Sequence, residues 1–161
     1  MSEDSFLACV ENNFGFLVNQ YGFVMHDHLY SSDPWSDGII EFQSPATIIR
    51  VGKDRNSFFV LMKPANEPDV AIQSLPAIVE ALSIMKEDEF LGPTPPSSYL
   101  VVLKQYAEVL KKYCLSFIKG DFSKWNNILK YDLAKMKKRF SKWPPEAFAD
   151  LENYIQSKNR I

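Results

Sequence analysis

The segment 121–143 carries apolar side chains at alternating steps of three and four residues, the spacing of one face of an α-helix. These positions are Phe122, Trp125, Leu129, Leu133, Met136, Phe140 and Trp143. The other positions are rich in cations, namely Lys124, Lys130, Lys135, Lys137, Lys138, Arg139 and Lys142, with Asp132 as the only acid after Asp121. We therefore expect a long helix that buries one face, including both Trp residues, and exposes a cationic one.

The charge of the chain is divided unevenly between its two parts. Residues 1–96 hold five Lys and Arg against fourteen Asp and Glu, whereas residues 97–161 hold thirteen against six. The net charges are therefore -9 and +7. Such a gradient can steer a partner towards one face, or it can be neutralised internally if the two parts pack together. The sequence leaves both alternatives open.

Length and composition predict one globular domain in a reducing compartment. The 161 residues can bury a core, and a hydrophobic fraction of 46% excludes a disordered chain. Cys9 and Cys114 lie in apolar helical patterns, so we expect them to be free and buried. The first residues are acidic where a signal peptide is basic, and no apolar run approaches the roughly eighteen residues of a membrane span. We expect a cytoplasmic protein that does not contact a membrane.

Periodicity predicts an α+β fold for residues 1–91. A first helix should end at Gly22, and apolar residues then alternate with period two over residues 23–30, 39–43, 47–51 and 58–62. Because the later connections are short, these strands should form a four-stranded antiparallel meander. A helix is expected over residues 74–85.

The C-terminal part is predicted to be mostly helical and packed on the sheet. A Pro-rich connection, residues 92–97, leads into a helix over residues 98–119 with a wide apolar arc. Gly120 and Asp121 can end this helix and begin the next, so we expect an antiparallel helical hairpin, followed by a short terminal helix. We therefore predict a single domain, residues 1–161. Its C-terminal helical part spans residues 98–161.

No catalytic motif stands out. His26 and His28 would share one face of a strand, and Asp33, Asp37 or Glu41 could add a carboxylate ligand. Two histidines specify a metal only weakly, so we favour a polar, solvent-facing strand surface as the explanation. Neither Cys is near a His, no Gly-x-Ser-x-Gly pattern occurs, and the segment 52–55 lacks the ending of a phosphate loop. We expect no catalytic residue, no metal and no cofactor, and therefore no enzyme.

A protein partner is the function that we favour. Residues 30–37 combine aromatic and acidic side chains in a loop, and exposed Trp and Tyr are common interface anchors. The predicted partner-binding residues are Tyr30, Asp33, Trp35, Asp37 and Glu41. This acidic face would suit a basic partner. The alternative for Trp35 is that it folds back over the end of the sheet.

Nucleic-acid binding through the Lys-rich helix 121–143 is the alternative function. Its cations could neutralise phosphates, and Trp125, Tyr131 or Trp143 could stack on bases. Against this stand a pI of about 5.7 and the expected burial of both Trp residues.

The order of elements resembles small bacterial immunity proteins of toxin systems. The resemblance lies in a first helix ending in Tyr21, Gly22 and Phe23, in a short meander rich in Ile, Phe and Val, and in a helix that runs into residues 117–122. It implies a protein that occludes a cognate toxin rather than a catalyst. A basic, nuclease-like toxin would match the acidic face. No motif allows binding residues to be carried over from the family.

Overall fold

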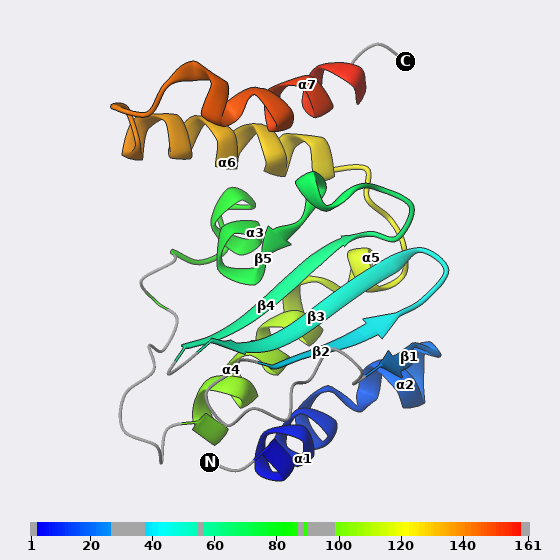
Figure 1. The fold of residues 1–161 in the computed structure, drawn as a ribbon. Helices are drawn as coiled ribbons and strands as arrows, with labels where there is room; N and C mark the ends of the chain where they lie inside the picture. Colours follow the sequence, from blue (N-terminus) through cyan, green and yellow to red (C-terminus); the bar gives the residue numbers. More distant parts are fainter. Residues whose placement is uncertain (1–2, 27–37, 55–56, 87–88, 90–98, 159–161) are drawn as a thin grey trace.

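A computed structural model describes residues 3–26, 38–54, 57–86, 89 and 99–158 (Figure 1). The N-terminal part contains α1 (Glu3–Phe14), α2 (Phe16–Tyr21), β1 (Val24–His26), β2 (Gly38–Gln43), β3 (Thr47–Asp54), β4 (Ser57–Pro64), the 3-10 helix η1 (Asp69–Ala71), β5 (Gln73–Ser74) and α3 (Leu75–Ala81). The C-terminal part contains α4 (Tyr99–Tyr113), α5 (Leu115–Ile118), α6 (Trp125–Arg139), the 3-10 helix η4 (Pro145–Phe148) and α7 (Ala149–Lys158). The predicted α+β class is confirmed.

The described strands form one antiparallel sheet in the order β1-β2-β3-β4-β5. The predicted meander is therefore confirmed, with one strand more than expected. That strand, β5, consists of two residues, and Gln73 pairs with Met62 while Ser74 pairs with Leu61. A strand this short has no periodicity, which is why the sequence did not indicate it.

The two faces of the sheet differ in composition, as period-two alternation requires. The inner face carries fully buried apolar side chains, Ile40, Phe42, Ile49, Val51, Val60 and Met62. The outer face carries half-buried apolar residues and charged ones, Ile39, Glu41, Arg50, Phe59, Leu61 and Lys63, of which Lys63 is buried. Figure 1 shows α4 and α5 behind the sheet, on the side of the inner face.

The helices complete one core cluster with the inner face. Helix α1 packs against α4, and both α3 and α4 contact β4. Helix α6 lies against α3 on one side and α7 on the other, so the top of the molecule in Figure 1 is a layer of two helices. We expected α6 to form a hairpin with the helix before it. Helical periodicity identifies an apolar face but not its neighbour, and the elements that pack most closely against α6 are α3 and α7.

Two predicted helices are interrupted, and the long Lys-rich helix is shorter than expected. The first helix divides at Gly15, and the helix over residues 98–119 divides at Cys114, whose backbone departs from helical angles (φ -113°, ψ 18°). Gly22 ends α2 as predicted, because its left-handed backbone (φ 71°) turns the chain out of the helix, and the Phe23 N–H then donates to the Leu17 carbonyl. Helix α6 ends at Arg139, and Phe140 has already left helical geometry (φ -112°, ψ 46°).

Buried hydrogen bonds join the C-terminal helices to the rest of the fold. The hydroxyl of Thr47, at the start of β3, donates to the Phe117 carbonyl at 2.7 Å. The indole N–H of Trp125, at the start of α6, donates to the Ala71 carbonyl at 2.9 Å. Both donors are almost fully buried. These bonds fix α5 and α6 against segments that are distant in the sequence.

Candidate functional site

The predicted partner face overlaps only partly with the described residues. Tyr30, Asp33, Trp35 and Asp37 lie in residues 27–37, outside the described residues. Glu41 is the predicted residue that the structure describes, and it lies on the outer face of β2. Its side chain is only 14% exposed, because it pairs with Arg50 on the neighbouring strand. The charge of Glu41 is thus neutralised within the sheet.

A row of alternating charges crosses the outer face. Arg50 Nε lies 3.0 Å from Glu41 Oε2, and Arg50 Nη1 lies 3.5 Å from Asp69 Oδ1. Lys63 Nζ lies 3.1 Å from the same oxygen of Asp69 and donates to the Glu67 carbonyl at 2.6 Å. The hydrogen bond from Lys63 and the charge of Arg50 lower the pKa of Asp69. Asp69 therefore stays ionised at neutral pH, and the row holds two acidic and two basic side chains.

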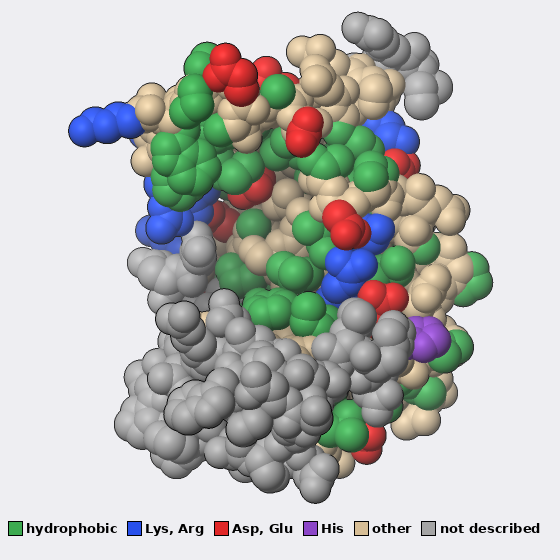
Figure 2. Space-filling model, in the orientation of Figure 1, with side chains coloured by type: hydrophobic (Ala, Val, Ile, Leu, Met, Phe, Trp, Pro, Cys, Tyr) green, Lys and Arg blue, Asp and Glu red, His purple; other side chains and the backbone are tan. Residues whose placement is uncertain are grey.

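Apolar side chains flank this row without belonging to the core. Ile39, Phe59 and Leu61 are half-buried, and within the described part of the chain none of them belongs to the core cluster or to the side chains packed against it. Phe59 lies across Gly52, its partner in the register, so closely that a Cβ on Gly52 would stand 2.0 Å from Phe59 Cζ. Figure 2 shows the charged side chains amid hydrophobic ones on the face turned to the viewer.

The structure describes one of the two histidines. His26 lies on β1 opposite Glu41, and His28 is outside the described residues. Across the part of the chain that the structure describes, no three His, Cys, Asp or Glu side chains gather closely enough to hold an ion. Glu41, which could have joined His26 as a ligand, is already bound to Arg50.

The thiols lie in surroundings that disfavour nucleophilic chemistry. Both cysteines are free and buried, as expected. Burial raises the pKa of Cys114 to about 12. Burial also raises the pKa of Cys9, although the amide of Asn13 hydrogen bonds to its sulfur and partly lowers it. A thiol that stays protonated is a poor nucleophile, so neither side chain is suited to covalent catalysis.

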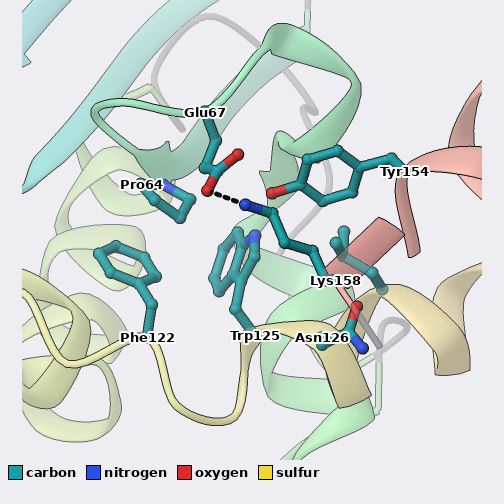
Figure 3. A pocket seen from close by; sticks show the side chains of 8 residues that line it. Pro64, Glu67, Phe122, Trp125, Asn126, Tyr154 and Lys158 are labelled. Carbon is teal, nitrogen blue, oxygen red and sulfur yellow. Dashed lines mark hydrogen bonds and ion pairs between the residues drawn. The ribbon is translucent and has the colours of Figure 1, made fainter. Parts of the chain in front are cut away.

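A small cavity lies where the turn after β4 meets the start of α6 and the end of α7 (Figure 3). It has a volume of about 180 Å³ and is lined by Pro64, Glu67, Phe122, Trp125, Asn126, Leu129, Tyr154 and Lys158. Its charges pair with each other, since Lys158 Nζ lies 2.6 Å from Glu67 Oε1.

The ionisable groups of this cavity are held away from proton transfer at neutral pH. Burial raises the pKa of Glu67, but hydrogen bonds from Lys158 and Tyr154, with the charges of Lys158 and Lys63, lower it by more. Burial and the contact with Glu67 raise the pKa of Tyr154. A general acid or base works best with a pKa near the ambient pH, which neither group has.

The cationic face of α6 is partly used inside the molecule. Lys135 pairs with Glu80 on α3, and Lys137 pairs with Glu152 on α7. Around Lys138 and Lys142, by contrast, no carboxylate of the described residues lies within ion-pairing distance. Two lysines of α6 therefore pair within the molecule, whereas Lys138 and Lys142, at and beyond the last turn, do not pair with a described carboxylate.

The end of α6 also exposes an aromatic residue that we expected to be buried. Trp143 is 52% exposed, whereas Trp125 is 3% exposed. The ring of Trp143 stacks on Phe140, with centroids 4.2 Å apart, and lies 6.2 Å from Phe148. The expectation failed because Trp143 lies beyond Arg139, where the helix ends and its periodicity no longer places side chains. The two Pro residues after Trp143 were the available signal of that end.

Comparison of the chain with protein-family models, with curated proteins and with solved structures finds no match. Among the described helices, none has both the length and the apolar character that crossing a bilayer requires.

Proposed function

We propose that this protein acts by binding another protein, and that the outer face of its sheet around Glu41 is part of the contact surface. The observation that carries the proposal is the position of Ile39, Phe59 and Leu61, which are half-buried apolar residues outside the core cluster. Apolar side chains beside polar and charged ones are the usual composition of a protein interface.

The charges on this face would serve specificity more than affinity. Glu41, Arg50, Asp69 and Lys63 hold one another in fixed positions, so a partner meets a preorganised pattern of alternating sign. Complementary patterns fix the orientation of a complex, and like charges reject a wrong partner. Tyr30, Asp33, Trp35 and Asp37 belong to the same proposed contact on the basis of the sequence alone, because residues 27–37 lie outside the described residues.

We further propose that the partner is a toxin of a bacterial toxin system, occluded by the bound protein. The resemblance to immunity proteins supports this step, and a gene for a toxin-like protein directly upstream would strengthen it. Binding by occlusion needs a complementary surface and no catalytic group, which agrees with the protonated thiols and the paired charges of the cavity.

The test compares two substitutions of equal chemistry. Leu61→Lys places a charge on the outer face, and Val101→Lys places one on α4, where Val101 is 53% exposed. With the partner captured from the native host and then purified, we expect Leu61→Lys to weaken binding by at least roughly tenfold, as for a residue near an interface centre. Val101→Lys should bind like the wild type, with both variants folded. Equal affinity of the two variants would contradict the assigned face.

Nucleic-acid binding by α6 remains the second candidate, and the exposure of Trp143 favours it, since an exposed indole can stack on a base. It requires an affinity that falls steeply with salt. A gel shift with single-stranded and double-stranded oligonucleotides at low ionic strength tests it, and the absence of a complex would exclude it.

A further inference from the structure

We propose that the basic aromatic end of α6 is a second interaction surface, which binds an acidic segment of a protein. We define this surface by Lys138, Arg139, Phe140, Lys142, Trp143 and Phe148. The inference goes beyond the proposed function and rests on it only in the premise that the chain works by binding. In Figure 1 this surface lies at the left end of the upper helical layer, apart from β1 and β2.

The aromatic part of the surface is held in place before any partner arrives. Trp143 stacks on Phe140 with an interplanar angle of 14° and on Phe148 with one of 25°. Phe148 is buried against the fold, so it anchors the stack. An aromatic side chain that is already ordered loses little conformational entropy on binding. Trp143 therefore has the exposure and the rigidity of an interface anchor.

The cations around Trp143 cannot all be explained by the stability of the helix. Basic residues in the last turn favour the negative end of the helix dipole, and this accounts for Lys138 and Arg139. It does not account for Lys142, which follows the end of α6. Arg139 also lies over the Phe140 ring at 5.4 Å from its centroid, so one cation is fixed against the aromatic stack. Figure 2 shows basic side chains beside hydrophobic ones at this end of the molecule.

The extent of the patch favours an acidic protein segment over a nucleic acid. Nucleic-acid affinity grows with the number of phosphates neutralised along a track of cations. Here the track is interrupted, since Lys135 and Lys137 pair with Glu80 and Glu152, and the whole chain has a net charge of -2. A few cations around one rigid Trp match a short run of Asp and Glu with an apolar residue.

The experiment measures the affinity of the full chain for two fluorescent probes at low salt. One probe is a short peptide of Asp and Glu with a central Leu, and the other is an oligothymidylate of equal net charge. The first variant combines Lys138→Gln, Arg139→Gln and Lys142→Gln. The matched control combines Lys86→Gln, Lys104→Gln and Lys119→Gln, which removes the same charge from exposed lysines elsewhere. A further variant, Trp143→Ala, removes the anchor without changing charge.

We expect the peptide to bind the wild type. Its affinity should fall by at least roughly tenfold for the first variant and for Trp143→Ala. The control should stay within about twofold, since distant exposed charges are screened by salt. The proposal would be overturned if the control lost as much affinity for the peptide as the first variant, or if the wild type did not bind the peptide. It would also be overturned if the wild type bound the oligothymidylate more tightly than the peptide. A salt-sensitive dimer that only the first variant abolishes would also overturn it, because the partner would then be a second copy of the chain. Leu61→Lys should bind the peptide with the affinity of the wild type. A failure of the proposed contact at the outer sheet face can therefore be told apart from a failure of this second surface.

Discussion

Lys158, near the C-terminus, forms an ion pair with Glu67 in the turn after β4, with Nζ and Oε1 2.6 Å apart. The bond connects α7 to a segment 91 residues earlier in the chain. With the pair of Lys135 and Glu80, it joins the basic C-terminal part to the acidic N-terminal part. A share of the charge gradient is thus neutralised inside one molecule, which was one of the two alternatives that the sequence left open.

Removing either partner of this ion pair should destabilise the fold only modestly. Both side chains are partly exposed, so solvent screens the attraction, and a double-mutant cycle of Glu67→Gln and Lys158→Met should give a coupling free energy of up to about 1 kcal/mol. Urea unfolding of the four proteins measures it. A coupling of zero would mean that packing alone holds α7 in place.

The contribution of Glu67 should depend on pH in a defined direction. Its pKa in the folded protein lies below the ordinary value of 4.5, so its carboxylate stabilises the fold at higher pH. That contribution is lost as the pH falls below 4.5 and passes through the folded pKa. The difference in unfolding free energy between the wild type and Glu67→Gln should therefore be largest near neutral pH and shrink in acid. A difference that grows in acid would contradict the assigned pKa shift.

The two Trp residues of the Lys-rich segment should behave oppositely on truncation. Trp125 is buried and donates to the Ala71 carbonyl, so Trp125→Ala should cost about 3–5 kcal/mol of stability. Trp143→Ala should cost about 1 kcal/mol or less, the value of its ring contacts. Chemical denaturation gives both values. Acrylamide should also quench the fluorescence of the exposed Trp143, so Trp143→Phe should reduce the quenchable fraction of the protein's fluorescence. An unchanged quenchable fraction would contradict the exposure of Trp143.

The buried hydroxyl of Thr47 should contribute measurably to stability. Thr47→Val keeps the shape of the side chain but removes the hydrogen bond to the Phe117 carbonyl, and should lower the free energy of unfolding by about 1 kcal/mol. The loss should not be larger, because that carbonyl also accepts a hydrogen bond from the Gly120 N–H. A free energy of unfolding equal to that of the wild type would show that this hydrogen bond makes no net contribution to stability.

Cys114 should resist thiol reagents in the native protein. Its pKa of about 12 and its burial keep it protonated and inaccessible at neutral pH. Labelling with a chromogenic disulfide should therefore proceed at the rate of unfolding and accelerate in urea. The variant Cys9→Ser isolates Cys114 in this measurement, and rapid labelling of the folded variant would contradict the structure.

Periodicity alone predicted the order of helices and strands, because an apolar stripe or an alternating run is local in the sequence. It did not predict the neighbours of α6, since the choice of α3 and α7 depends on surfaces that meet only after the chain folds. It also missed β5, whose two residues are placed by pairing with β4.

The candidate surfaces were harder to predict than the fold. Glu41 was predicted as a partner-binding residue of an acidic face, which stays a prediction, but the sequence did not indicate that its cross-strand neighbour Arg50 neutralises it, because that pairing depends on the register of the hairpin. Trp143 was predicted as a core residue because the periodic pattern continues past the end of α6. The helix ends at Arg139, whereas the pattern continues to Trp143, which is therefore exposed.

The most direct test of the central claim is hydrogen exchange of the protein with and without its captured partner. Binding through the outer sheet face predicts that the amides of β2 and of its neighbour β3 become protected in the complex. Leu61→Lys should abolish that protection at partner concentrations that saturate the wild type, and Val101→Lys should preserve it. The account would be contradicted if the amides of the sheet and those of the basic aromatic end of α6 all stayed unprotected and only other segments gained protection.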